Sequence, residues 1–224
     1  MKNTIKDDQW IYKMPSDKRE SVQKGQTQQI LDWGMSHKPS ASIWKTMTDA
    51  RYIQRMNRAL DLFDIPKNIE IAADIGCGPW SGIFYIRKWN TMYAIDPSWD
   101  IYDNLNLVKV SSESVQVIEE YAQDFKLPEK SQIMFSINSL NHGGDITKSI
   151  ANCMLNLCDN GLFFLHLHLR NKTEVDKGHP IDLDDDQAMS IINQHKVVSS
   201  HIYDFDPLKA PGGHRTIVAT LLKE

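Results

Sequence analysis

Two acidic residues and a glycine turn between them carry the clearest chemical signal in this chain. Asp74 closes an apolar run, a Gly-Cys-Gly-Pro turn follows at residues 76–79, and a second apolar run ends at Asp96. Glycines let the backbone approach a ligand closely, and an acid after the next strand can accept hydrogen bonds from two ribose hydroxyls. The spacing predicts a strand–helix–strand unit that binds a nucleoside-bearing cofactor; an ordinary strand–turn–helix is the alternative.

The acid before the turn helps to distinguish between cofactors. A dinucleotide site reads Gly-x-Gly-x-x-Gly, but here the third glycine, Gly82, comes one place late and Pro79 follows the second glycine. A carboxylate at Asp74 would repel a pyrophosphate, whereas it could pair with an ammonium group. S-adenosylmethionine carries an ammonium group and a sulfonium but no phosphate, so the turn favours that cofactor over NAD.

The same residues resemble motif I of the class I methyltransferases, in its Asp-x-Gly-x-Gly-Pro form, followed by the family's ribose-binding acid. The resemblance implies S-adenosylmethionine as cofactor and S-adenosylhomocysteine as its product. It also implies that the turn holds the methionine end and the second acid holds the ribose. The cofactor-binding residues predicted in this way are Asp74, Gly76, Gly78, Pro79, Asp96 and Pro97.

Two later loops complete the predicted cofactor site, because ligands of open parallel sheets bind beyond the carboxyl ends of the strands. Residues 122–128 resemble the family segment in which an acid accepts from the adenine amino group. Gln123 stands at the usual place of that acid, so Asp124, the carboxylate of this loop, is predicted to take the role. Asn138 opens the next loop, where the resemblance places the backbone against the methionine part of the cofactor.

Histidines supply the candidate catalytic groups. His142 follows in the same loop, and the ordinary pKa of a histidine suits removal of a hydroxyl proton near neutrality. We predict that His142 is the general base, with a structural histidine at the start of a helix as the alternative.

A second pair of histidines lies in the apolar run Leu162–Leu169. Strand alternation puts His166 and His168 on one face near the carboxyl end, where a buried parallel strand is normally apolar. We therefore predict a polar crevice in which His168 and Arg170 hold an anionic or hydroxyl-rich acceptor. The alternatives are a structural pair or a metal site; no compact cluster supplies a third ligand, so no metal is predicted. The base is left open among His142, His166, His168 and His179.

The rest of the chain reads as the α/β domain that would position these loops. Helices are expected at Ile146–Leu157 and Asp184–His195. Strands are expected at Ile69–Ile75, Met92–Ile95, Val115–Tyr121, Ile133–Ile137, Leu162–Leu169, Val197–Phe205 and Thr216–Leu222. Seven strands whose last pair forms a hairpin-like unit match the doubly wound, mostly parallel, Rossmann-like methyltransferase sheet, in which the last strand is antiparallel.

Residues 1–68 differ from the rest of the chain. They are polar, hold three of the six tryptophans (Trp10, Trp33 and Trp44), and carry a helical pattern over Ser42–Phe63. We predict an N-terminal helical cap over residues 1–68 and a class I methyltransferase domain over residues 69–224. The helices either pack on the sheet edge or cover the cofactor pocket, as N-terminal helices do in the family that this chain resembles.

The amino-acid composition narrows the class of protein and the kinds of partner that we expect. The 224 residues are 41% hydrophobic and 24% charged, which suits an ordinary globular domain. The net charge of −4 and the scattered basic residues argue against a nucleic-acid partner. Three cysteines without metal spacing predict reduced thiols, and no segment resembles a signal peptide or a membrane span. The expectation is a cytoplasmic protein with a small-molecule acceptor and no membrane partner.

Together these patterns predict an S-adenosylmethionine-dependent methyltransferase. The chain is loosely similar to small bacterial methyltransferases of carbohydrate pathways, which implies O-methylation of a sugar or polysaccharide precursor. Oxygen is favoured because a histidine base helps a hydroxyl and is not needed by a neutral amine. The alternatives are an N-methyltransferase, a non-catalytic methyltransferase-like subunit and an NAD-dependent enzyme, and a homodimer is left open beside a monomer.

Overall fold

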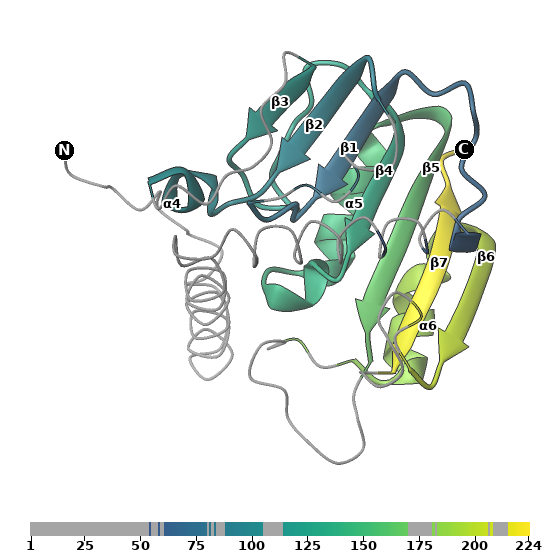
Figure 1. Ribbon diagram of the computed structural model, residues 1–224. Coiled ribbons are helices and arrows are strands. Elements are labelled where there is room, and N and C mark those ends of the chain that lie inside the picture. Colours follow the sequence, from purple (N-terminus) through teal and green to yellow (C-terminus); the bar gives the residue numbers. More distant parts are fainter. Residues whose placement is uncertain are drawn as a thin grey trace.

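The computed structural model describes residues 54, 58, 61–79, 81, 83, 88–104, 114–169, 181, 183–205, 207 and 215–224. In these residues seven strands form one sheet in the order β3-β2-β1-β4-β5-β7-β6 (Figure 1). The strands are β1 (Ile71–Ile75), β2 (Thr91–Ile95), β3 (Val115–Ile118), β4 (Ser131–Ile137), β5 (Leu157–His168), β6 (Lys196–Tyr203) and β7 (Thr216–Leu222).

The sheet is parallel from β3 to β5, and β7 runs antiparallel between β5 and β6. Four of the five residues of β1 and of β2 are buried, as expected of parallel strands covered on both faces. The strand order reverses between β1 and β4, so a crevice for a ligand is expected at the carboxyl ends of these strands. The predicted doubly wound sheet with an antiparallel last strand is confirmed.

Several element bounds differ from those predicted, and one short helix is additional. β3 ends at Ile118 rather than Tyr121, so Glu120 and Tyr121 belong to the loop that follows. β5 begins at Leu157 rather than Leu162, because its first residues continue the ladder beyond an irregularity in the register with β4. A short helix, α4 (Trp99–Asn104), follows β2. The first difference matters most, since it moves two polar side chains from the sheet into a loop at its carboxyl edge.

Two helices cover one face of the sheet, α5 (Ile146–Asn156) and α6 (Asp185–Ile192) (Figure 1). Each helix is preceded by an aspartate that serves as its N-cap. The side chains of Asp145 and Asp184 accept a backbone N–H of the first turn, and Asp184 forms a capping box with Gln187. Their apolar side chains pack into one core with alternate residues of the strands, among them Ile150, Cys153, Phe163, Leu165, Ile192 and Ile217.

The opposite face carries a second core to which the N-terminal region contributes. Phe63 is 1% exposed, and its ring lies 4.6 Å from that of Phe164 and edge-on to Phe135 at 6.5 Å. The predicted helix over Ser42–Phe63 falls mainly outside the described residues, which give helical backbone at 54, 58, 61 and 62. The predicted cap over residues 1–68 therefore stays a prediction, but its end belongs to the core of the sheet.

Candidate functional site

The glycine turn after β1 is held by its own backbone geometry and by close neighbours. Gly76 and Gly78 have φ values of +66° and +59°, in the left-handed region that favours glycine. The backbone N–H groups of Gly76 and Cys77 donate to the carbonyl of Ile95 at 2.8 and 3.1 Å. A Cβ on Gly76 would collide with the side chain of Ser139, which lies after β4. The turn therefore needs its first glycine both for its conformation and for the close approach of the next loop.

Asp96 follows β2 directly, and two backbone groups fix its carboxylate. The N–H of Gly78 donates to Oδ2 at 2.8 Å, and the N–H of Ser98 donates to Oδ1 at 2.9 Å. The side chain is 5% exposed. Burial raises the pKa of Asp96 to about 6, and the hydrogen bonds from Ser98 and Gly78 only partly oppose that rise. The result is a rigid acceptor whose charge changes just below neutral pH.

Asp74 is a buried residue near the end of β1. Its carboxylate is buried and accepts a hydrogen bond from the Ser81 hydroxyl at 2.6 Å. Gly78 and Pro79 are buried beside it. The described pocket at this edge of the sheet is not lined by these residues, so the expected contact of Asp74 with an ammonium group stays a prediction.

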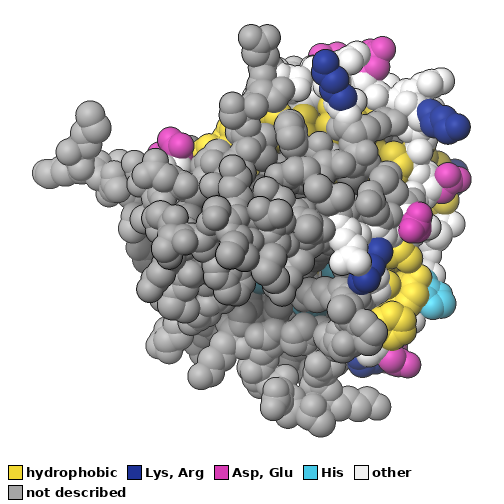
Figure 2. All heavy atoms as spheres, in the orientation of Figure 1, with side chains coloured by type: hydrophobic (Ala, Val, Ile, Leu, Met, Phe, Trp, Pro, Cys, Tyr) yellow, Lys and Arg dark blue, Asp and Glu magenta, His cyan; other side chains and the backbone are white. Residues whose placement is uncertain are grey.

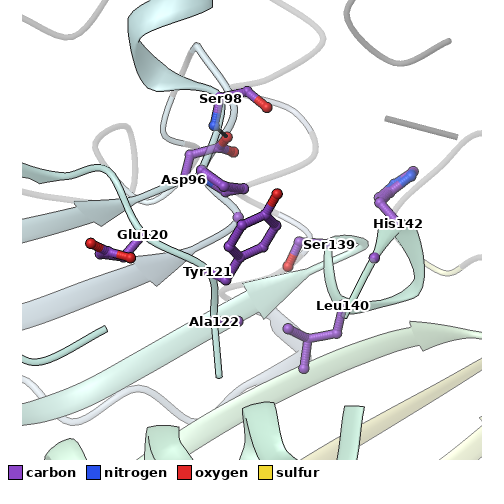
Figure 3. A pocket seen from close by; sticks show the side chains of 11 residues that line it. Asp96, Ser98, Glu120, Tyr121, Ala122, Ser139, Leu140 and His142 are labelled. Atoms are coloured by element: carbon purple, nitrogen blue, oxygen red, sulfur yellow. Dashed lines mark hydrogen bonds between the residues drawn. The ribbon is translucent and has the colours of Figure 1, made fainter. Parts of the chain in front are cut away.

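A pocket lies at the carboxyl edge of the sheet, where the loops after β1, β2, β3 and β4 meet (Figure 3). Figure 3 shows the ring of Tyr121 between Asp96 and Ser139 in that view, with His142 on the other side from Asp96. Its lining residues are Gly76, Asp96, Pro97, Ser98, Glu120, Tyr121, Ala122, Ser139, Leu140, His142 and Gly143. The structure thus brings three predicted cofactor residues (Gly76, Asp96 and Pro97) and the predicted base, His142, into one pocket.

The loop after β3 contributes two pocket residues that the sequence analysis missed. Glu120 and Tyr121 line the pocket, whereas Asp124 is exposed and is not among the lining residues. Glu120 lies two residues beyond the end of β3, at the carboxyl edge of the parallel sheet where ligands bind, and a prediction that ended the strand at Ile118 would have found it. The adenine role expected of Asp124 stays a prediction, and Glu120 is the acidic residue of this loop among those that line the pocket.

Two asparagines of α5 hold this loop in place. The side-chain amide of Asn152 donates to the carbonyls of Ala122 at 3.1 Å and Phe125 at 2.9 Å. Farther along the loop, the side-chain oxygen of Asn156 accepts the N–H of Leu127 at 2.9 Å. A buried loop must satisfy its backbone groups in this way. The bond from Asn152 fixes Ala122, which lines the pocket, whereas Asn156 holds the part of the loop outside the pocket.

The loop after β4 positions His142. Asn138 has a φ of +54°, and its N–H donates to the carbonyl of His166 at 3.1 Å. The hydroxyl of Ser139 donates to the carbonyl of Ile75 at 2.6 Å, which ties this loop to the end of β1. The 3-10 helix η2 (Leu140–His142) follows and ends with His142 at the pocket wall. Asn138 itself is not a lining residue, so its role toward the methionine part stays a prediction.

The histidine pair of β5 lies deeper in the fold. His166 and His168 are 0% and 3% exposed, and their rings meet edge to face with centroids 5.6 Å apart. Across the antiparallel ladder they stand opposite Val218 and Thr216. Neither lines the pocket of Asp96 and His142. Arg170 and His179 lie outside the described residues, so the proposed acceptor role of His168 and Arg170 stays a prediction.

The described surface shows no sign of a metal centre or a nucleic-acid interface. In the described part of the chain, no group of three or more His, Cys, Asp or Glu side chains is arranged to hold a metal ion. On the face seen in Figure 2, the Lys and Arg side chains that are described lie apart from one another among acidic ones, rather than as a basic stripe. The helices that the structure describes include none long and apolar enough to cross a membrane.

Comparison with known proteins finds the fold rather than a close relative. No protein-family model and no curated protein matches the chain. Among solved structures, an S-adenosylmethionine-dependent methyltransferase from Leishmania major has a TM-score of 0.63 at 14% identity, covering 86% of this chain and 81% of that chain.

Two further similar structures were solved with S-adenosylhomocysteine. The N-methyltransferase NodS from Bradyrhizobium japonicum has a TM-score of 0.54 at 13% identity, covering 78% of this chain and 86% of that one. The plantazolicin methyltransferase BamL, also bound to a triazolic desmethylPZN analogue, has a TM-score of 0.56 at 14% identity, covering 93% of this chain and 98% of that one. Identities this low show the fold alone, and that fold is the one of the class I methyltransferases.

Proposed function

We propose that this chain is an S-adenosylmethionine-dependent methyltransferase that acts on a small polar acceptor. The observation that carries the proposal is the single pocket in which the Asp96 carboxylate, the Gly76 turn and the His142 imidazole meet. Such a reaction needs two groups from the protein. One is an acid that binds the ribose hydroxyls, and the other is a base that accepts a proton.

The lining of the pocket fits this cofactor better than a dinucleotide. Asp96 would accept from the ribose hydroxyls, and Pro97 and Tyr121 offer apolar surface for a flat purine. Glu120, rather than the exposed Asp124, would accept from the adenine amino group. Among the described lining residues there is no Lys or Arg to neutralise a pyrophosphate, and two carboxylates there would repel one. These features support S-adenosylmethionine over NAD.

S-adenosylmethionine would supply an electrophilic methyl group whose bond to sulfur breaks with both electrons staying on sulfur. His142 would accept the proton of an acceptor hydroxyl as its oxygen bonds to that methyl carbon. The surrounding loops would hold the reactants in line and keep water away, which is where most of the rate gain arises in such a displacement.

The acceptor that we propose is a sugar or another hydroxyl-bearing precursor, methylated on oxygen. A second candidate is a small-molecule amine, because a structure with this fold, NodS, is named an N-methyltransferase. A neutral amine needs no base, so replacement of His142 by Gln should slow methyl transfer to a hydroxyl far more than transfer to an amine. Methylation assays that pair sugar nucleotides with amines of similar size would separate the two.

Calorimetric titration with S-adenosylmethionine, S-adenosylhomocysteine and NADH tests the cofactor. We expect micromolar binding of the first two, its loss in Asp96→Ala and its retention in Asp124→Ala, a matched acid outside the pocket. Binding of NADH alone would overturn the proposal. Cofactor binding without methyl transfer to any acceptor would instead favour a non-catalytic subunit.

A further inference from the structure

We propose that Asn141 is a positioning residue that sets His142 at the pocket wall; the inference rests on the proposed function of that pocket. Asn141 is 0% exposed and stands beside His142 in the short helix η2. Such a buried polar side chain next to a candidate base has either a structural or a positioning role. Its contacts distinguish the two roles.

The Asn141 amide joins three segments of the chain. Its Nδ2 donates to the carbonyls of His168 and Ile181, both at 3.1 Å, and its Oδ1 accepts the N–H of His168 at 3.0 Å. Its backbone carbonyl also accepts the N–H of Ile181 at 3.3 Å. Both amide protons and the amide oxygen are thus engaged with backbone groups, which fixes the side chain in a single orientation.

Because Asn141 and His142 are neighbours in η2, fixing Asn141 also restricts the direction of the His142 side chain. A 3-10 helix has three residues per turn, so its three side chains point in different directions. Leu140 is 3% exposed in the core with α5, Asn141 faces the end of β5, and His142 faces the pocket. Gly143 and Gly144 follow and bring no side chains to anchor the chain. The backbone N–H of His142 donates to the carbonyl of Ser139 at 3.0 Å, and Asp145 is held farther along by the side chain of Gln123. Asn141 is the buried side chain next to His142 that ties this turn to His168 and Ile181.

The partners of Asn141 also stand, in the sequence, at the two ends of a stretch in which a residue predicted to hold the acceptor occurs. His168 and Ile181 flank residues 169–180, the stretch that includes Arg170. A single amide thus connects both flanks of that stretch with the residue next to the base. Loss of the amide should disturb His142 and acceptor use together, while leaving the cofactor contacts at Asp96 intact.

A matched control separates positioning from plain stability. Asn156 is also buried, at 9% exposure, and its amide likewise crosslinks backbone through Leu127 N–H and Asn152 carbonyl. None of these partners lines the pocket. Asn156→Ala should lower the melting temperature much as Asn141→Ala does, but it should leave His142 unchanged.

The experiment is NMR titration of ring-labelled histidines with S-adenosylhomocysteine bound, with the His142 signal assigned from its absence in His142→Gln. We expect Asn141→Ala to bind S-adenosylhomocysteine within about twofold of the unmodified protein while the His142 signal shifts or its titration midpoint moves. The signal in Asn156→Ala should match that of the unmodified protein. Once an acceptor is known, kcat should fall by about tenfold to a hundredfold with the cofactor KM unchanged.

Each outcome bears on one proposal. An unchanged His142 signal in folded Asn141→Ala overturns the positioning role, whereas failure of the unmodified protein to bind S-adenosylhomocysteine overturns the proposed function. If Asn141→Ala does not fold, Asn141→Ser serves instead. It removes the amide that bridges His168 and Ile181 and adds no charge, so the same His142 signal decides.

Discussion

The carboxylate of Asp96 accepts a 2.8 Å hydrogen bond from the backbone N–H of Gly78, 18 residues earlier in the chain. The bond links the two parts of the motif with which the sequence analysis began. It means that the glycine turn after β1 holds the acid after β2, in addition to any contact that the turn makes with a ligand. Burial raises the pKa of Asp96 to about 6 although this hydrogen bond opposes the rise, and two predictions follow from that value.

The first concerns cofactor binding. We expect the affinity for S-adenosylhomocysteine to rise as pH increases through about 6, because the ionised Asp96 carboxylate is the better acceptor for ribose hydroxyls. Binding near pH 6 should then release protons, so the heat of binding should vary with the ionisation enthalpy of the buffer. Asp96→Asn should bind weakly and without this pH dependence. A flat profile in the unmodified protein would remove Asp96 from the ribose site.

The second concerns stability. The pKa of Asp96 is raised from 3.8 to about 6 in the folded state, so its contribution is full below pH 3.8 and is lost as pH rises through 6. The stability of the unmodified protein relative to Asp96→Asn should therefore fall by an amount on the order of 2–3 kcal/mol between pH 4 and 7. Urea unfolding of both proteins at several pH values measures it. A relative stability that rises over this range would contradict the raised pKa.

Gly76 provides a test of the turn. Gly76→Ala should lower the free energy of unfolding by about 2–4 kcal/mol, because a Cβ is strained at φ +66° and would collide with Ser139. The double variant Gly76→Ala/Ser139→Gly should recover the steric part of the loss and not the backbone strain. Denaturant unfolding of the unmodified protein, the two single variants and the double variant gives the coupling free energy between positions 76 and 139. Strict additivity would show that the two residues do not compete for space.

Tyr121 tests the proposed purine wall. Tyr121→Ala should weaken S-adenosylhomocysteine binding by about fivefold to a hundredfold, because stacking of an aromatic ring on a base is worth about 1–3 kcal/mol. Tyr121→Phe keeps the ring and should bind within about twofold of the unmodified protein. Calorimetry on the two variants, with Asp124→Ala as an exposed neighbour in the same loop, makes the comparison. Equal affinities for Tyr121→Ala and Tyr121→Phe would place the purine elsewhere.

The parts of the site that could be predicted from the sequence are those defined by residue types at short spacings along the chain. The turn at residues 76–79 and Asp96 were predicted because apolar runs, glycines and an acid at set spacing are local features. The seven-stranded, mostly parallel sheet with an antiparallel last strand was expected from the class I resemblance, and the structure confirms it.

The parts that were missed depend on contacts between distant residues or on where a strand stops. Asn141 is one amide among many in the sequence, and its meaning lies in hydrogen bonds to residues 27 and 40 positions away. Glu120 and Tyr121 were read as the end of a strand, since nothing in their residue types shows that β3 ends at Ile118. Asp124 was preferred as the only carboxylate in its segment, but it is exposed and does not line the pocket, which its residue type does not reveal.

The position of Phe63 has a consequence for how such a protein can be divided or recombined. Its ring packs against the stacked rings of Phe135 and Phe164, so a chain begun at residue 69 would leave the sheet without that buried ring. Loss of a buried Phe costs about 3–5 kcal/mol, a large part of the stability of an ordinary domain. The region before residue 69 could be exchanged between proteins of this fold as a route to new acceptors. Such an exchange would succeed only where the incoming segment supplies a large apolar side chain at the position of Phe63.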